Sequence, residues 1–254
     1  MSPWYLFWLN YAIKVSQCVE LPLVMLPGWF LRMRVLDPMM RATRGSVDAA
    51  CIARHKGWAI NLSGGYHHAT MSNGGGFCIY PDITFVTRYM EQWYGYKRIL
   101  IIDLDAHQGN GHERDHMDKS KYYIIDAYNH AIYPGDTYAK QAISDDIPCH
   151  RSTTDQMYLH KVDVSLTKAF EEFRPDFVVY NAGTDCMRGD PLGCLKVSEQ
   201  GIIDRDEVVF RHAYEQNKVP ILMVLSGGYQ MTNAPVIAQS IRKLDEKFNL
   251  LKSE

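Results

Sequence analysis

Three side chains that can bind a metal ion occupy every second position in the segment Arg98–His112: Asp103, Asp105 and His107. The segment begins with the continuous apolar run Ile99–Ile102, which is typical of a strand buried on both faces of a sheet. Because side chains two positions apart share one face of an extended chain, all three are expected to point the same way. Burying two carboxylates without compensation is costly, so the segment predicts a cation, most simply a divalent metal ion.

Chemically capable side chains also follow three other apolar runs, in each case after small residues. His67 and His68 follow Trp58–Leu62, Asp185 follows Phe177–Tyr180, and Tyr229 follows Ile221–Leu225. Glycines in these segments let the backbone turn sharply and approach a ligand closely. In open α/β sheets, ligands bind beyond the carboxyl ends of the strands. The four segments together therefore predict one shared site at that edge.

The residue types at these positions indicate hydrolytic metal chemistry. Asp105, His107 and Asp185 can supply two oxygens and one imidazole, a set that suits zinc, iron(II), cobalt or manganese. Three protein ligands leave a position open for water or substrate, which is typical of a catalytic site. For Asp105 and His107 alone, a buried ion pair or a hydrogen-bonded turn is the alternative.

The tandem His67-His68 predicts acid–base chemistry, because adjacent side chains in an extended loop diverge and do not bind one ion together. One imidazole can act as general base toward water and then as general acid toward a leaving amine, with Asp103 placed to tune its partner. Two surface histidines in a flexible loop are the alternative. Tyr229 can donate a hydrogen bond to a substrate carbonyl, or it can simply pack. Phe77, after three glycines, can line a narrow tunnel or close an ordinary turn.

The elements that must position these side chains alternate between apolar runs and amphipathic segments. Strands are expected at Trp58–Leu62, Ile99–Leu104, Tyr122–Ile125, Phe177–Tyr180 and Ile221–Leu225. Helices are expected near Ile83–Trp93, from Thr154 to before Pro175, near Asp204–Tyr214 and near Ala234–Phe248. This order predicts an α/β fold with three layers, in which helices cover a mostly parallel central sheet. Without a proline- or glycine-rich linker, residues 10–254 are expected to form one domain, preceded by an atypical aromatic-rich segment, 1–9.

Composition narrows the class of protein. The 254 residues are 46% hydrophobic, enough for a sizeable core, and the net charge of −2 gives no case for direct nucleic-acid binding. The arginines between Arg32 and Arg44 are interpreted as a solvated surface. Six cysteines without a Cys-x-x-Cys motif predict free thiols in a reducing compartment. Met1–Ile13 lacks the marks of a signal peptide, and Lys14 interrupts it short of the ~18 residues of a membrane span, so a soluble chain is expected with that segment packed or frayed.

With these motifs in place, the chain resembles the zinc-dependent histone deacetylases of the arginase–deacetylase superfamily, and it looks closest to the class IV branch. The resemblance runs from about Asn10 to Phe248 and is carried, in family order, by Ile102–Arg114, Tyr133–Asp136, Val179–Asp185 and Ser226–Tyr229. It implies an arginase/deacetylase-like fold and hydrolysis of Nε-acyl-lysine on histones or other proteins. The implied acyl groups are acetyl and long-chain fatty acyl.

The resemblance also implies a role for each candidate residue. The zinc ligands would be Asp105, His107 and Asp185. The catalytic group would comprise His67 bonded to Asp103, His68 as general base beside Asn110, and the carbonyl-polarising Tyr229. The acyl-lysine tunnel would be lined by Gly76, Phe77 and Tyr133. Structural potassium would lie near the Asp103–His107 backbone, with Asp126. Other deacetylases or chromatin proteins are implied as partners, in the nucleus, the cytoplasm or both.

Three departures from the family pattern carry expectations of their own. Asn110 stands where many relatives have an aspartate, and an amide stabilises an imidazolium less, so His68 is expected to be a stronger acid. Tyr133 replaces a phenylalanine usual in class I enzymes, which makes one tunnel wall more polar. The family's N-terminal part, with its first strand and an acidic rim loop, is expected to be absent, and Met1–Leu9 does not resemble it. That absence predicts an open sheet edge and exposed apolar surface.

Two other functions stay open. The same core could hydrolyse a small acylated amine such as an acetylpolyamine, with a rim that selects a cation. A shortened chain could instead be a catalytically silent protein that interacts with deacetylases or other partners. The chain has too few suitably placed aspartates and histidines to hold an arginase-like pair of metal ions.

Overall fold

The computed structural model describes residues 1–251, so the last three residues of the expected 10–254 domain lie outside the described part. A six-stranded sheet with the order β1-β6-β5-β2-β3-β4 forms the centre, and each strand is parallel to its neighbours. The strands are β1 Trp58–Asn61, β2 Ile99–Asp103, β3 Tyr122–Asn129, β4 Asp145–Cys149, β5 Phe177–Asn181 and β6 Ile221–Val224. This confirms the expected parallel sheet.

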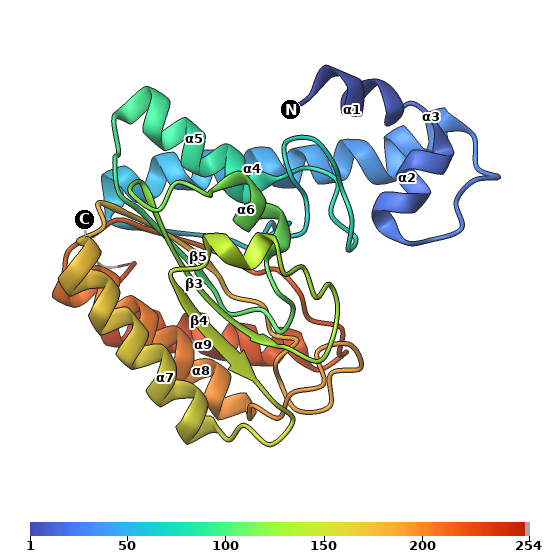
Figure 1. Ribbon diagram of the computed structural model, residues 1–254. Coiled ribbons are helices and arrows are strands. Elements are labelled where there is room, and N and C mark those ends of the chain that lie inside the picture. Colours follow the sequence, from blue (N-terminus) through green and yellow to red (C-terminus); the bar gives the residue numbers. More distant parts are fainter. Residues whose placement is uncertain (252–254) are drawn as a thin grey trace.

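Helices cover both faces of the sheet, as Figure 1 shows. One face carries α4 Asp37–Lys56, α5 Asp82–Tyr94 and α6 Asn110–Asp115. The other face carries α7 Asp155–Lys168, α8 Glu199–Phe210 and α9 Asn233–Phe248; α7 and α8 continue as the π-helical segments Ala169–Phe173 and Arg211–Gln216. The three-layer α/β fold expected from the alternation of elements is therefore confirmed.

The sheet is covered on both sides because its central strands are apolar along most of their length. In β2, Ile99 and Ile101 belong to the core beneath α4 and α5, whereas Leu100 and Ile102 belong to the core beneath α7, α8 and α9. Each such side chain contributes roughly 1.5–3 kcal/mol when it is fully buried. Continuous apolar runs are what a two-sided parallel sheet requires, and they made these strands predictable.

Strand β4 and helix α4 were not predicted, each for a physical reason. Strand β4 has a charged start, exposes alternate residues and contains Pro148, which is tolerated because β4 lies at the edge of the sheet. Helix α4 buries small side chains, among them Ser46, Ala50 and Ala53, so it carries little hydrophobic periodicity. Its contact with the sheet depends on close approach of backbones rather than on large apolar residues.

The N-terminal residues are packed, not frayed. They form α1 Pro3–Trp8, α2 Ala12–Val19 and α3 Gly28–Leu31, which lie at one end of α4 (Figure 1). Their core contains Tyr5, Leu9, Val15, Cys18, Val19, Leu31, Ile79 and Tyr80. The opposite side of α1 exposes Trp4 and Phe7, in line with the predicted exposed apolar surface. All six cysteines are free thiols, and no helix within residues 1–251 is long and apolar enough to cross a bilayer.

Candidate active site

The sequence-predicted site residues meet at the carboxyl edge of the sheet. β2 ends at Asp103, and the turn after it carries Asp105 and His107. The segments after β1, β5 and β6 bring the histidine pair, Asp185 and Tyr229 to the same edge. These four strands are parallel neighbours in the order β1-β6-β5-β2, so their carboxyl ends lie side by side.

Asp105, His107 and Asp185 form the one group of three histidine, cysteine or acidic side chains within residues 1–251 whose ligand atoms converge for a metal ion. Their ligand atoms all lie within 4.8 Å of one another, and all three residues are buried. His107 Nδ1 is 3.1 Å from Asp105 Oδ1 and 2.8 Å from Asp185 Oδ2. The predicted trio thus forms, while Asp103 turns away from it toward the histidine pair.

The other oxygen of each carboxylate is held by donors outside the trio. Asp105 Oδ2 accepts hydrogen bonds from Ser226 Oγ at 3.0 Å and from the Gly227 amide at 2.9 Å. Asp185 Oδ1 accepts one from the Ala106 amide at 2.7 Å. Such outer partners orient ligands toward a metal, and the donor set of two oxygens and one imidazole fits a divalent ion.

Electrostatics favour a cation at the same place. Burial and the negative charge of Asp105 raise the pKa of Asp185 to about 7, because two carboxylates share one dry site. A divalent cation relieves this repulsion. The residues present therefore fit the metal that the sequence predicted.

The two histidines differ in charge because their partners differ. His67 Nδ1 donates to Asp103 Oδ2 at 2.9 Å, and His68 Nδ1 lies 2.8 Å from Asn110 Oδ1. Burial disfavours the charged form of His67, but the carboxylates of Asp103 and Asp105 outweigh it and raise its pKa to about 9. Burial and the charge of His67 hold the pKa of His68 well below its usual value. At neutral pH a neutral imidazole therefore stands beside a cationic one.

The amide partner also determines the tautomer of His68. Asn110 Nδ2 donates to Asp136 Oδ2 at 3.4 Å, which leaves its Oδ1 to accept from His68 Nδ1. Nε2 of His68 then carries the lone pair. The predicted departure at Asn110 is thus a direct contact of the second histidine. This hydrogen bond raises the pKa of His68, but burial and the charge of His67 outweigh it.

A cavity of about 290 Å³ opens beside these groups. Its lining consists of Glu20, His68, Gly76, Phe77, His107, Ile132, Tyr133, Leu192 and Tyr229. The Phe77 and Tyr229 ring centroids are 6.1 Å apart, and those of His68 and Tyr133 are 5.0 Å apart. The three residues expected to line a tunnel thus meet around one opening.

Two backbone features shape this cavity. A Cβ at Gly76 would lie 2.3 Å from His68 Cδ2, so only glycine fits there. The Asp190 carboxylate accepts hydrogen bonds from the amides of Tyr229 and Leu192, both at 2.9 Å, and so links two segments of the wall. Burial and the charges of Asp105 and Asp185 raise the pKa of Tyr229, which keeps its hydroxyl protonated as a donor.

Several residues of the site were missed by sequence reasoning. His112 Nε2 lies 2.8 Å from Asp103 Oδ2, so one carboxylate oxygen bonds two imidazoles. Glu20 lines the cavity, and its Oε1 accepts from the Gly76 amide at 3.1 Å. An acidic side chain therefore stands at the opening, although the acidic rim loop was expected to be absent. His112 lies inside a quoted motif, whereas no pattern marks Glu20.

Arg205 was also missed, because it was assigned only to a helix. Its side chain is fully buried and pairs with Asp206 at 2.9 Å. Its Nη1 donates to the Gly183 carbonyl at 2.6 Å and to the Leu104 carbonyl at 3.2 Å. Arg205 thus ties together the turns after β2 and β5, which carry the metal-competent side chains.

Asp126, expected beside a structural potassium ion, is buried in β3 next to these groups. Its Oδ2 accepts from the Gly109 amide at 2.8 Å, but its Oδ1 has no hydrogen-bond partner. Burial and the charges of Asp103 and Glu113 raise its pKa well above the usual value. An unpartnered buried oxygen of this kind fits a hard cation.

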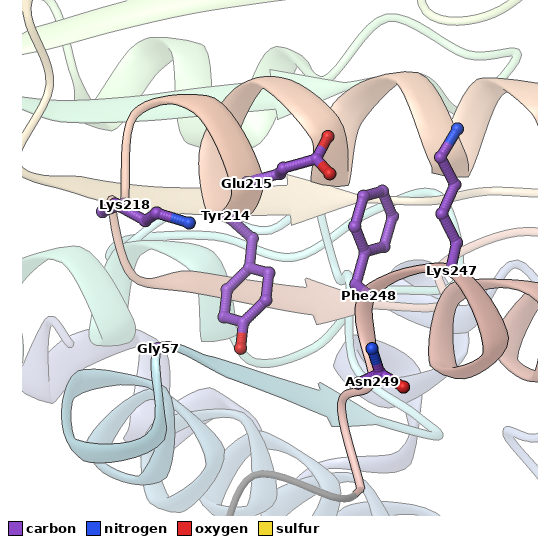
Figure 2. A pocket seen from close by; sticks show the side chains of 7 residues that line it. All are labelled: Gly57, Tyr214, Glu215, Lys218, Lys247, Phe248 and Asn249. Atoms are coloured by element: carbon purple, nitrogen blue, oxygen red, sulfur yellow. The ribbon is translucent and has the colours of Figure 1, made fainter.

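A second cavity, of about 440 Å³, lies at the opposite edge of the sheet. Figure 2 shows the Tyr214 and Phe248 rings there, with Glu215, Lys218 and Lys247 around them. Gly57 precedes β1 and Lys218 precedes β6, so this cavity belongs to the amino ends of the strands. None of the predicted site residues lines it.

Comparison with known proteins agrees with this geometry. The family model described as a histone deacetylase domain matches residues 30–244. Histone deacetylase 2 of Arabidopsis thaliana is 44% identical over 244 residues, which cover 96% of this chain and 63% of that protein. The chain thus spans somewhat less than two thirds of that relative.

Two solved structures share the fold. The HD domain of HDA15 superposes with a TM-score of 0.67 at 26% identity, covering 80% of this chain and 60% of that one. Acetylpolyamine aminohydrolase from Burkholderia pseudomallei gives a TM-score of 0.68 at 20% identity, covering 80% of this chain and 61% of that one. The latter likeness concerns the fold alone. Taken together with the matched domain and the plant relative, these findings establish that the chain belongs to the histone deacetylase family.

Proposed function

We propose that this chain is a zinc-dependent hydrolase of Nε-acyl-lysine. The observation that carries the proposal is the convergence of a metal-competent trio, a neutral His68 and a protonated Tyr229 on one cavity. A hydrolase of amides needs a base for water, a donor for the carbonyl oxygen and an acid for the leaving amine. Family membership supports the same reaction class.

Each group has a stated task in this proposal. Asp105, His107 and Asp185 would hold zinc, which would supply Lewis-acid chemistry for amide hydrolysis. His68 Nε2 takes the proton of the attacking water, a contribution that is typically ~10²–10⁴-fold. The Tyr229 hydroxyl donates to the carbonyl oxygen as it gains negative charge. The protonated histidine pair, held by Asp103 and Asn110, then delivers a proton to the departing lysine amine.

The cavity supports a lysine side chain as the substrate arm. Phe77 and Tyr133 offer flat apolar walls to its methylenes, and Gly76 lets the backbone approach closely. We assign acetyl-lysine as the first substrate and long-chain acyl-lysine as a second, on histones or other proteins. The same proposal includes a potassium ion at Asp126 and partners among deacetylases or chromatin proteins. It also includes a nuclear or cytoplasmic location, membership of class IV, and one domain over residues 10–254.

The position of Glu20 favours one alternative function, hydrolysis of a small cationic acylated amine. A carboxylate at the opening attracts cationic substrates, and a free acetylpolyamine carries additional ammonium groups. Hydrolysis of such an amine would use the same catalytic groups. The two candidates differ only in what enters the cavity.

Metal content and turnover test the proposal directly. Purified protein is expected to hold about one zinc ion per chain and to hydrolyse acetyl- and myristoyl-lysine peptides. Turnover of acetylpolyamines but not of peptides would favour the second candidate. Folded, zinc-loaded protein with no turnover of any of these would overturn the enzyme and leave an interaction protein.

A further inference from the structure

The loop formed by residues 70–79, which carries Gly76 and Phe77 of the cavity wall, is held on its outer side by the N-terminal helices. The Tyr5 hydroxyl of α1 donates to the Ile79 carbonyl at 3.0 Å, and the amide of Ser2 donates to the Met71 carbonyl at 2.7 Å. From α2, Lys14 Nζ donates to Asn73 Oδ1 at 2.6 Å. The contacts reach both ends and the middle of the loop.

The fit between Tyr5 and this loop is tight. Tyr5 is only 2% exposed, and its hydroxyl also lies 3.3 Å from Cys18 Sγ. A Cβ at Gly74 would lie 2.4 Å from the Tyr5 hydroxyl oxygen. No side chain larger than glycine therefore fits between α1 and the loop.

The inner side of the same loop contacts the catalytic groups. Gly76 lies against the His68 ring, and the Phe77 ring faces Tyr229. Phe77 has a φ of 66°, in the left-handed region that non-glycine residues rarely adopt. Such a conformation persists only where the surroundings hold it, and the contacts from α1 and α2, on either side of Phe77 in the loop, are part of those surroundings.

From this arrangement we propose that Tyr5 is a positioning residue, which fixes the wall of the acyl-lysine cavity by holding the loop of residues 70–79. The proposal rests on the proposed function and extends it to the aromatic N-terminal segment. Tyr5 contacts neither the metal-competent trio nor the histidine pair. Loss of its hydrogen bond would leave the Ile79 carbonyl unpaired and loosen the wall, so substrate binding should suffer more than the chemical step.

The test compares Tyr5→Phe with Tyr11→Phe, which removes the same hydroxyl from a residue that is 46% exposed. Amide hydrogen exchange is measured over residues 70–79, together with KM and kcat for an acetyl-lysine peptide. Tyr5→Phe is expected to speed exchange in the loop and to raise KM by about three- to tenfold, with kcat within about twofold. Tyr11→Phe is expected to change neither quantity.

The outcomes separate this proposal from the proposed function. Absence of turnover in the wild-type chain counts against the hydrolase, whereas the exchange measurement still tests the loop. Unchanged exchange and KM in Tyr5→Phe would overturn the positioning role, as would faster exchange across the whole sheet with kcat and KM altered together. If Tyr5→Phe does not fold, Lys14→Met breaks the exposed contact with Asn73 and should speed loop exchange in the same direction. Unchanged loop exchange in that variant would likewise overturn the proposal.

Discussion

The two edges of the sheet carry cavities that differ in what converges on them. The cavity at the amino edge is the larger, at about 440 Å³ against about 290 Å³. Its charged groups are partly solvated: the Lys247 side chain is 38% exposed and pairs with Glu207. At the carboxyl edge, His68 and His107 are 9% and 6% exposed; His68 bonds the half-buried Asn110 and His107 bonds the buried Asp185.

The comparison shows that the size of a cavity does not identify the candidate active site. Burying a polar side chain is costly unless other groups hold it, so a cluster of held, buried polar groups signals a selected function. The exposed lysines around Tyr214 and Phe248 at the amino-edge cavity do not have this desolvation cost. Matched variants at the two edges test whether only the carboxyl edge supports catalysis.

The largest difference is expected from the metal-competent trio. Asp185→Asn removes one carboxylate from the group that converges on His107 and should abolish zinc binding and lower kcat/KM by more than ~10³-fold. Glu215→Gln makes the same chemical change at the amino-edge cavity and should leave both unchanged. Zinc analysis and peptide hydrolysis measure the two effects. A comparable loss in Glu215→Gln would contradict the assignment of catalysis to the carboxyl edge.

The next effect concerns the two cavity tyrosines. Tyr229→Phe removes a donor aimed at the substrate carbonyl and should lower kcat by ~10²–10³-fold with zinc retained. Tyr214→Phe removes a hydroxyl from the amino-edge cavity and should leave kcat within about twofold. Steady-state kinetics on zinc-matched samples separates them. Equal kcat values for Tyr229→Phe and wild type would remove Tyr229 from the mechanism.

A third prediction compares the stability supplied by a buried and by an exposed ion pair. Arg205→Met leaves Asp206 buried without its cation and should lower the free energy of unfolding by ~3–5 kcal/mol. Arg242→Met breaks a pair whose side chains are 73% and 63% exposed, and it should cost only ~0–1 kcal/mol. Urea unfolding measures both. Similar losses would mean that Arg205 does not hold the turns after β2 and β5 as inferred.

The smallest expected effect is a shift in pH dependence. The pKa of His68 is depressed, so its neutral, basic form persists well below pH 6.5. In Asn110→Asp a carboxylate beside Nδ1 stabilises the imidazolium and raises that pKa, by roughly 1–3 units. Catalysis needs the neutral form of His68. On acidification, Asn110→Asp should therefore lose activity at a higher pH than the wild type does.

Profiles of kcat/KM between pH 5 and 8 test this shift, because the neutral histidine is the working form throughout that range. Asn217→Asp provides the control, since Asn217 lies near the amino-edge cavity and bonds the His212 carbonyl. An unshifted acid limb in Asn110→Asp would show that His68 is not the titrating base.

Much of the site was predictable from local sequence. Asp105, His107 and Asp185 were found because each follows an apolar run, and parallel strands bring their carboxyl ends to one edge. The family prediction is confirmed. Strand β4 and helix α4 were missed, because an edge strand with proline and a helix that packs through small residues lack a clear hydrophobic period.

By itself the sequence determined the parallel sheet, the metal-competent trio and the histidine pair, since these follow from side chains adjacent to buried strands. Only the tertiary structure decided that one oxygen of Asp103 bonds both His67 and His112, and that Glu20, Tyr5 and Arg205 support the site. Their contacts join residues far apart in the chain: Tyr5 bonds Ile79, 74 positions away, and Arg205 bonds Leu104, 101 positions away. Periodicity reports only on near neighbours, so contacts of this range follow from packing alone.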